Sequence, residues 1–447
     1  MESTSASPAD LEADGIVAVI GTVVNPAGLT HAKLTPVRRA ATFADSGLGA
    51  SPVWHAFAID QTGIAFTECA GVVGDERIRL DLTALRRIGD GLAWAPAEFF
   101  DQAGAPVPAC SRGTLARVVD RLAEAGLRAL VGHEMEFVLV APDGAQLPST
   151  SWAQYGLSGV LEHEGFVRDV LAAAGTAGVG IEQFHPEYGA NQFEISLAPQ
   201  PPVAAADDLV LMRLIVSRVA RQHGMRVSLS PVPFVGSVGS GAHQHFSLTR
   251  RGVPLFCGGP GPHGMTADGQ AAIAGLLAGL PEAQGILSGS IVSGLRLQPG
   301  HWAGAFVCWG AENREAAVRF LVGGPANPHG ANVECKIVDP SANPYFASAA
   351  ILGLALDGIT RGLALPVETT VDPALQSVAQ HAAAGTRQLP AFQGETIGAL
   401  AASELMRGIL GDAAVQASVD VRRFELDHYG GLTPDELADK FRLAWSL

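Results

Sequence analysis

Carboxylates inside apolar segments are the feature that most restricts how this chain can fold. The segment LVGHEMEFVLV has the composition of a buried strand but contains Glu134 and Glu136. Because side chains two residues apart on a strand point to the same face, the two carboxylates would lie about 7 Å apart on one side of a sheet. Two like charges there are costly unless a cation neutralises them, although a solvent-facing strand edge would also tolerate them.

Three further acids repeat this pattern. In HPEYGANQFEISL, Glu187 precedes a Gly-Ala-Asn turn and Glu194 lies on the apolar segment after it, while Glu334 stands in the apolar run NVECKIVDP. The segment GSGAHQHFSL adds His243 and His245, which would share a strand face after a glycine-rich turn. Since oxygen ligands suit magnesium or manganese better than zinc, the set predicts a site for hard divalent cations, with two ions more plausible than one.

Fixed positive charge of the kind that binds phosphate is present in ENREAAVRF, which contains Arg314 and Arg319. Arginine binds phosphate oxygens in a two-pronged geometry and keeps its charge at working pH, although a surface helix with scattered arginines would give the same pattern. Magnesium, arginines and glycine loops together indicate ATP-dependent phosphoryl transfer.

The pattern of apolar runs and turns predicts two domains. Short β-branched or aromatic runs at 15–24 and 54–59 indicate strands of a small, mostly β unit. The turn-rich segment 101–112 precedes the helical pattern TLARVVDRLAEAGL, so we place the domains at 1–108 and 109–447.

The second part alternates helical and strand patterns, which is typical of an α/β or α+β domain. Helices are expected at 206–224, 269–281 and 344–363. The segment TPDEL has a capping box with proline at the first helical position, so it predicts a final helix.

Charge and composition narrow the possible partners and compartment. The formal net charge of −15 disfavours nucleic acid and anionic membranes. The apolar stretches 271–280 and 345–359 are too short to span a bilayer, and the acidic N-terminus lacks the pattern of a signal peptide. The five cysteines form no C-x-x-C pair, which favours reduced thiols. We therefore expect a cytoplasmic enzyme with small-molecule substrates.

Several motifs together resemble those of the glutamine synthetase family, from about residue 15 to 447: GHEMEF, HPEYGANQFEI, GSGAHQHFSL, RLQPG, NREAAVR and VECKIVDPSANPY. The resemblance implies an α+β fold, in which an N-terminal β-grasp domain precedes a glutamine synthetase-type α/β catalytic domain. It also implies a homo-oligomer, a dodecamer of two stacked hexameric rings with active sites between neighbouring subunits.

The same resemblance implies a role for each matching residue. ATP and two or three Mg²⁺ (or Mn²⁺) ions would be the cofactors. One ion would be held by Glu136, Glu187 and Glu194, and another by Glu134, His243 and Glu334. The remaining matches are Arg314 and Arg319 for the transferred phosphate, His245 and Ser247 for the nucleotide, and Arg296 and Gly239 for the glutamate substrate.

Departures from the family pattern concern the two substrates. Pro299-Gly300-His301-Trp302 aligns with the flap, the loop that closes over the acyl phosphate, and Trp302 replaces a glutamate of the ammonium site. Asn25 aligns with an aspartate of that site. Lys336 stands in place of an arginine for the glutamate carboxylate, and Val238 replaces an asparagine. His329 and Asn332 occupy usually basic nucleotide-site positions.

These departures favour an amide ligase that couples glutamate, through γ-glutamyl phosphate, to an organic amine rather than to ammonia. Trp302 could hold a cationic amine by cation–π attraction or stack on an aromatic one, or it could merely anchor the loop. An ethanolamine-like monoamine is the favoured substrate, and a polyamine or an aromatic amine is possible. Alternatives are a ligase for a non-glutamate carboxylate, a true glutamine synthetase using ammonia, and a non-catalytic ring-forming homologue.

Overall fold

The computed structural model describes residues 8–67, 70–149, 151–327 and 329–447, which form two sheets and the helices around them. The first sheet has the strand order β2-β1-β6-β4-β3, with β5 paired to β6. Its helices and strands are α1 (Pro8–Ala13), β1 (Ala18–Val24), β2 (Thr30–Pro36), α2 (Ala40–Asp45), β3 (Leu48–Ala50), β4 (Glu76–Leu80), β5 (Arg86–Gly89) and β6 (Leu92–Phe100).

The first sheet has a small core of its own. Val19, Phe43, Ile78 and Phe99 are buried together in it. Gly21 on β1 permits this packing, because a Cβ at that position would come within 2.4 Å of Leu80 Cδ2. The strand expected at 15–24 is therefore confirmed as β1.

The strand expected at 54–59 is wrong. The chain forms a 3₁₀ helix at Pro52–His55 instead, in which the Ser51 side chain accepts a hydrogen bond from the Val53 N–H. Pro52 occupies the first turn, where its missing N–H has no cost. Local capping thus outweighs the β propensity of the aromatic residues.

The second sheet has the order β16-β13-β14-β15-β11-β7-β9-β8, with β10 on β7 and β12 on β11. Its strands are β7 (Leu127–Val140), β8 (Ile181–Pro186), β9 (Gln192–Leu197), β10 (Arg226–Ser228), β11 (Gln244–Arg250), β12 (Val253–Pro254), β13 (Phe306–Ala311), β14 (Ala316–Leu321), β15 (Asn332–Cys335) and β16 (Arg387–Gln388).

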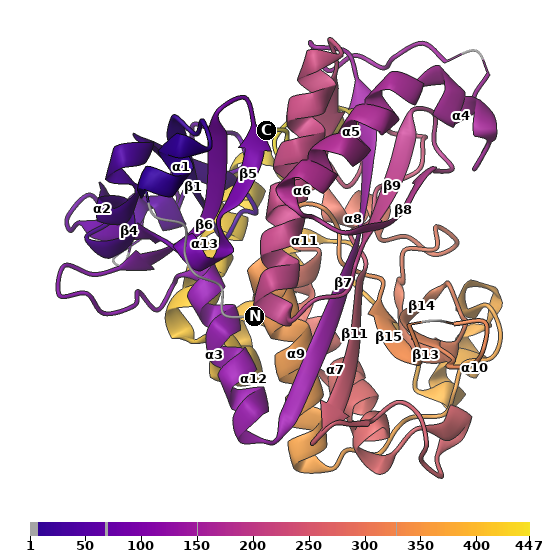
Figure 1. Ribbon diagram of the computed structural model, residues 1–447. Helices are drawn as coiled ribbons and strands as arrows, with labels where there is room; N and C mark the ends of the chain where they lie inside the picture. Colours follow the sequence, from indigo (N-terminus) through magenta and orange to yellow (C-terminus); the bar gives the residue numbers. More distant parts are fainter. Residues whose placement is uncertain (1–7, 68–69, 150, 328) are drawn as a thin grey trace.

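Helices separate the two sheets. In Figure 1, α3, α6 and α9 stand between the N-terminal sheet and the long strands β7 and β11. α7 packs against α9 where a Cβ on Gly275 would lie only 2.5 Å from Gly358 Cα. The helices are α3 (Ser111–Glu124), α4 (Leu157–Glu162), α5 (Glu164–Ala177), α6 (Pro202–Gln222), α7 (Ala267–Leu287), α8 (Ser293–Arg296), α9 (Pro344–Arg361), α10 (Val378–Ala384), α11 (Gln393–Ala402), α12 (Glu404–Leu410), α13 (Asp412–Tyr429) and α14 (Pro434–Phe441).

The helical pattern TLARVVDRLAEAGL (114–127) is confirmed as α3, and the helices expected at 206–224, 269–281 and 344–363 are confirmed as α6, α7 and α9. The final helix is confirmed as α14, with the capping box between Thr433 and Glu436 formed in both directions. No helix in the described ranges is both long and apolar enough to span a bilayer. Cys110, Cys257, Cys308 and Cys335 are free thiols, and Cys69 lies outside the described residues.

Arg112 on α3 joins the first sheet to the helices. Its guanidinium is buried and donates to Asp207 of α6 at 2.9 and 3.0 Å, to Glu98 of β6 at 2.5 Å and to Asp81 at 2.8 Å. The Tyr345 hydroxyl of α9 donates to Asp207 as well, at 2.8 Å. One buried cation thus holds acids from both parts of the chain.

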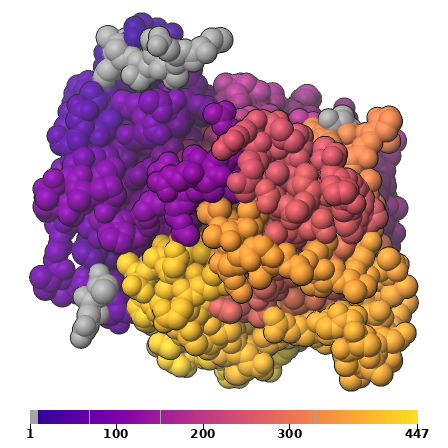
Figure 2. All heavy atoms as spheres, turned by 90° about the horizontal axis from the view of Figure 1, so that it is seen from below, coloured from indigo at the N-terminus to yellow at the C-terminus, as the bar shows by residue number. Residues whose placement is uncertain are grey.

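The C-terminal helices return to the N-terminal part. Figure 2 shows the C-terminal residues, in yellow, beside the N-terminal segments in purple. The Tyr429 hydroxyl of α13 donates to Asp60, and Gln61 Nε2 donates to the Ala444 carbonyl at 3.1 Å. Segments from the two ends of the chain therefore stabilise each other.

Candidate functional site

Strand register places the candidate residues on one face of the second sheet. Arg319 on β14 lies opposite Glu334 on β15, and Glu334 lies opposite His245 on β11. Residues directly opposite each other on paired strands share a face, so the three side chains form a row across the sheet. The next position in that row, on β7, is Gly132, which leaves room beside His245 for a side chain two residues further along β7.

A second row continues on the same sheet. Glu136 on β7 lies opposite Glu194 on β9, and Glu194 lies opposite His185 on β8. Like charges directly opposite on a sheet repel each other, so the pair of glutamates has a cost that a cation would remove. The solvent-facing strand edge that the sequence allowed for Glu134 and Glu136 is excluded, because β7 is paired on both sides, with β11 and with β9, and the two side chains are only 22% and 13% exposed.

The first group of side chains consists of Glu134, His243, His245 and Glu334. His243 Nδ1 lies 3.0 Å from Glu134 Oε2 and 3.3 Å from Glu334 Oε1. His245 Nε2 lies 3.2 Å from Glu134 Oε1. The three residues expected to share an ion therefore contact one another, while the ligand atoms that converge within 4.8 Å are those of Glu134, His245 and Glu334, so that His245 takes the place expected for His243.

Cations already balance the acids of this first group. Burial opposes ionisation of Glu334, but the charges of Lys336 and His245 outweigh burial and lower its pKa to about 2. Burial alone would lower the pKa of His245, yet Glu134 raises it to about 9. Lys336 Nζ and Arg319 Nη1 donate to Glu334 at 3.1 and 3.2 Å.

The second group consists of His185, Glu187 and Glu194, with Glu136 beside it. His185 Nε2 lies 3.3 Å from Glu194 Oε1, and His185 Nδ1 lies 3.7 Å from Glu187 Oε1. Glu136 is held by the Gly241 N–H at 2.8 Å and by Gln192 Nε2 at 3.4 Å. The glutamates expected to share the other ion are therefore neighbours, but a histidine accompanies them.

Negative charge exceeds positive charge in this second group. Burial, and then the charge of Glu134, raise the pKa of Glu194 to about 8. Burial and the charge of Glu136 raise the pKa of Glu187. The hydrogen bond to Glu194 raises the pKa of His185 to about 9. Buried carboxylates with raised pKa values and oxygen-rich ligands fit a hard divalent cation, which would supply the missing charge.

Arg296 lies against the first group. Its side chain is buried and donates to His243 Nε2 at 3.1 Å and to the carbonyls of Lys336 and Ile337 at 3.2 and 3.4 Å. A Cβ on Gly241 would lie 2.5 Å from His243 Nε2 and 2.9 Å from Glu136 Oε1, so only glycine allows this convergence.

Gly239 and Ser247 lie at the edges of the site. A Cβ on Gly239 would lie 2.8 Å from Arg296 Cγ. The Gly239 carbonyl accepts a hydrogen bond from Gln192 Nε2 at 2.9 Å. Ser247 on β11 follows His243 and His245 at two-residue spacing, so the three residues share a strand face. His245 Nδ1 also contacts Asn332 Oδ1 at 2.9 Å. The nucleotide and substrate roles of these residues stay predictions.

The two candidate arginines differ in their surroundings. They lie on a turn and a strand, not on the surface helix that the sequence left open. Arg319 bridges two glutamates: its Nη1 donates to Glu334 at 3.2 Å, and its Nη2 donates to Glu312 at 2.7 Å. Arg314 is exposed in the turn before β14. Arg319 is thus the arginine placed against the acids.

The segment expected to act as the flap, Pro299 to Trp302, lies in the loop of residues 297–304 directly after α8, and this loop is called the flap below. Trp302 is 56% exposed. Its φ of 53° lies in the left-handed region, which residues other than glycine adopt rarely. The alternative in which Trp302 anchors the loop by burial is therefore wrong within this chain. Instead, the N–H groups of Gly300 and Trp302 donate to the buried carboxylate of Glu315.

Asn25 lies in a tight turn after β1 and is 3% exposed. Its Nδ2 donates to the Phe57 carbonyl at 2.8 Å, and its Oδ1 accepts from the Leu29 N–H at 3.0 Å. Both ends of the side chain thus hold the turn, and its role in an amine site stays a prediction.

Sequence reasoning missed four polar side chains of this region: His185, Gln192, Glu312 and Glu315. His185 stands two residues before Glu187 in the quoted motif, so strand spacing alone could have included it. Gln192 likewise stands two residues before Glu194 on β9, whereas Glu312 and Glu315 contact site residues through the fold, and no strand spacing signals them.

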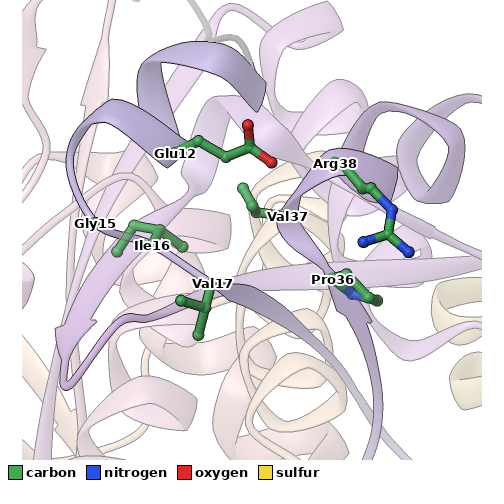
Figure 3. A pocket seen from close by; sticks show the side chains of 7 residues that line it. All are labelled: Glu12, Gly15, Ile16, Val17, Pro36, Val37 and Arg38. Atoms are coloured by element: carbon green, nitrogen blue, oxygen red, sulfur yellow. The ribbon is translucent and has the colours of Figure 1, made fainter.

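A hollow elsewhere on the surface contains none of the candidate residues. It lies at the edge of the first sheet and has a volume of about 320 Å³ (Figure 3). Its lining residues are Glu12, Gly15, Ile16, Val17, Pro36, Val37 and Arg38. Among these lining residues, Glu12 is the one acid and Arg38 the one base. A single carboxylate beside a guanidinium does not form a metal-ligand group like the two described above.

Metal binding to the two groups predicts a stability change. A divalent cation that binds only the folded chain is expected to stabilise it by about 2.7 kcal/mol per site at a hundred times the dissociation constant. Thermal unfolding with and without Mn²⁺ measures this as a rise in Tm. Glu194→Ala should reduce the rise, whereas Glu182→Ala, at an exposed glutamate on β8, should leave it unchanged. An equal rise in Glu194→Ala would contradict the assignment.

Comparisons with known proteins agree with this geometry. The model of the glutamine synthetase catalytic domain matches residues 108–438. The chain is 38% identical over 449 residues to gamma-glutamylpolyamine synthetase GlnA3 of Streptomyces coelicolor, covering 99% of this chain and 96% of that protein. It is 31% identical over 330 residues to glutamine synthetase of Pyrococcus abyssi, covering 73% of each.

Solved structures show the same fold. A crystal structure of a novel glutamine synthase homolog superposes with a TM-score of 0.86 at 28% identity, covering 96% of this chain and 99% of that one. The GmaS/ADP complex superposes with a TM-score of 0.84 at 24% identity, covering 96% and 97%. The second similarity concerns the fold alone.

Proposed function

The chain belongs to the glutamine synthetase family, and from this premise we propose that it joins the side-chain carboxylate of glutamate to an organic amine. Membership makes it a carbon–nitrogen ligase of small molecules, and such ligases use ATP and divalent metals. The observation that carries the proposal is the pair of neighbouring ligand groups on one sheet face, with Arg319 in contact with Glu334.

We assign two or three Mg²⁺ (or Mn²⁺) ions to these groups. Glu134, His243 and Glu334, with His245 beside them, would hold one ion, and Glu187 and Glu194, with Glu136 and His185 beside them, would hold another. When bound, the ions supply positive charge that stabilises the transferred phosphoryl group. Ser247 and His245 would contact ATP.

The proposed reaction has two steps. A side-chain carboxylate oxygen of glutamate attacks the γ-phosphorus of ATP, the bond to the bridging oxygen breaks, and ADP leaves. The amine nitrogen then attacks the acyl carbon, loses a proton, and expels phosphate to leave an amide. Arg319 and Arg314 would balance the charge of the transferred group, and Arg296, Lys336 and Gly239 would orient the glutamate.

The identity of the amine is the finer part of the proposal. No contact in the site supports the ethanolamine-like monoamine that the sequence favoured. The relative with which this chain shares 38% identity over 99% of its length is named a gamma-glutamylpolyamine synthetase. We therefore propose a polyamine as substrate and keep ethanolamine and aromatic amines as alternatives within the same assay.

ADP release with ATP, Mg²⁺ and glutamate tests the proposal when ammonium, ethanolamine, putrescine, spermine and aniline are compared. Mass spectrometry of the amide identifies the product. We expect the highest kcat/KM with a polyamine and the corresponding γ-glutamyl amide. Highest efficiency with ammonium would identify a true glutamine synthetase, and turnover only with another acid would refute glutamate as substrate. If ADP release stays at background with every combination of acid and amine, the result would favour a non-catalytic homologue.

Trp302 provides a test of the amine pocket. Trp302→Glu replaces an exposed ring with a carboxylate and should lower kcat/KM for the organic amine relative to ammonium by about tenfold, because a cation–π contact contributes about 0.5–2 kcal/mol. Asn25→Asp is not a suitable companion change, since Asn25 Nδ2 donates to the Phe57 carbonyl and a carboxylate there would face an acceptor. Trp302→Phe is the matched control, and an unchanged ratio in Trp302→Glu would remove Trp302 from the pocket.

Domain organisation and assembly complete the proposal. We propose that residues 1–108 form a β-grasp domain and residues 109–447 the catalytic domain, supported by the separate core of the first sheet. We also propose a dodecamer of two hexameric rings, in which Asn25 would approach a neighbouring subunit's site. Native mass spectrometry measures the subunit number directly.

A further inference from the structure

Both ends of the flap are attached to the site. At its start, Arg296 is buried and contacts His243 and the Lys336 carbonyl. At its end, a Cβ on Gly304 would lie 2.9 Å from Lys336 Cβ, so the backbone passes directly against that residue. Lys336 in turn pairs with Glu334. Both ends of the flap therefore lie beside the first ligand group, although its middle is exposed at Trp302.

One carboxylate holds the middle of the flap. Glu315 Oε1 accepts from the Gly300 N–H at 2.7 Å, and Glu315 Oε2 accepts from the Trp302 N–H at 2.8 Å. Glu315 is 4% exposed, whereas the donors belong to exposed residues, so the two bonds are partly shielded from water. Hydrogen bonds to a charged acceptor are among the stronger ones in proteins, and burial strengthens them further.

Hydrogen bonds of Asn313 hold the backbone around Glu315 in place. The Glu315 N–H donates to Asn313 Oδ1 at 3.2 Å, and Asn313 Nδ2 donates to the carbonyls of Thr369 and Val371 at 2.8 and 3.0 Å. The next residue begins β14, the strand that carries Arg319. The carboxylate thus links the flap to the strand that contacts the acids.

The backbone of the flap needs such a restraint. Trp302 has a φ of 53° and Gly300 a φ of 79°. A left-handed residue other than glycine is unfavourable unless its surroundings hold it, and the tryptophan ring, being exposed, offers no packing that would do so. The two bonds to Glu315 restrain this conformation from outside the loop, in addition to a turn bond within it from the His301 N–H to the Gln298 carbonyl at 3.3 Å.

We propose that Glu315 is a positioning residue that holds the flap closed over the acyl phosphate and thereby favours attack by the amine over attack by water. The inference rests on the proposed function. Water attack on the acyl carbon would expel phosphate and regenerate glutamate, so that ATP and water give ADP and phosphate with no amide formed. Both Glu315 oxygens already accept from the flap, which favours this role over direct binding of the amine.

The ratio of ADP to amide tests the inference. Wild type should form about one ADP per amide. Glu315→Ala, which loses both bonds, should raise the water-dependent share of ADP release by at least about tenfold, because loss of even one such hydrogen bond corresponds to about that rate change. Glu315→Gln keeps one acceptor and should show a smaller rise. KM for the amine should increase in both variants, while KM for ATP stays unchanged.

Glu368→Gln is the matched control, because Glu368 accepts the Ala311 N–H on the neighbouring strand and touches no part of the flap. Its ratio should stay at the wild-type value. A wild-type ratio in both Glu315 variants would overturn the inference, as would an equal rise in Glu368→Gln. If Glu315→Ala does not fold, Glu315→Gln alone decides. Absence of ADP release in wild type with every amine would instead refute the proposed function.

Discussion

Replacing Glu134 with glutamine should reduce ATP-dependent turnover by more than about a hundredfold, because even partners that only orient a metal ligand typically contribute 10–100-fold. Glu134 contacts both His243 and His245, at 3.0 and 3.2 Å, and stands at the centre of the first ligand group. Glutamine has the same shape but lacks the charge, so the change replaces a carboxylate ligand with a neutral amide, which binds a divalent cation more weakly, while preserving the volume of the side chain.

Steady-state ADP release measures this effect, and the Mn²⁺-dependent rise in Tm shows whether metal binding is lost with it. Glu182→Gln is the control, since Glu182 lies on β8 of the same sheet with its side chain 42% exposed. Circular dichroism should show the same fold in both variants. Turnover within tenfold of wild type in Glu134→Gln would remove the metal assignment.

Arg112→Ala should lower the free energy of unfolding by about 3–5 kcal/mol, because removing one partner of a buried ion pair leaves the other charge without compensation. Burial raises the pKa of Asp207, and Arg112 is the cation that opposes this rise. The substitution removes the guanidinium that pairs with three acids, Asp207, Glu98 and Asp81.

Denaturant unfolding measures this loss at a fixed protein concentration, since assembly would add to stability. Arg117→Ala is the matched control, because Arg117 lies on the same helix but is exposed, and we expect a change of no more than about 0.5 kcal/mol. Equal stability of the two variants would show that the buried network does not hold the first sheet to the helices.

The helices were predictable because their signals are local. α14 follows from the capping box of Thr433 and Glu436, and α3 from the apolar periodicity before a glycine stop. The strand expected at 54–59 failed for the same reason, since Ser51 and Pro52 make a local turn that aromatic content does not reveal. Sheet order depends on pairings between distant segments, and it came only from the structure.

The acids of the site were also predictable, since Glu134, Glu136, Glu194 and Glu334 stand out in apolar strands. The register explains why such costly residues share one face: β11, β15 and β14 bring His245, Glu334 and Arg319 into one row. The bonds of Glu315 to the flap were not predictable, because Gly300 and Trp302 meet it through backbone N–H groups that carry no sequence signal.

The central claim is that the side-chain carboxylate of glutamate is phosphorylated before the amine attacks. Glutamate labelled with ¹⁸O in that carboxylate tests the claim most directly, with ATP, Mg²⁺ and the best amine, by mass spectrometry of the released phosphate. A γ-glutamyl phosphate transfers one carboxylate oxygen to phosphate, so each phosphate released with an amide should contain one ¹⁸O atom. Phosphate free of ¹⁸O, formed together with the amide, would contradict the account.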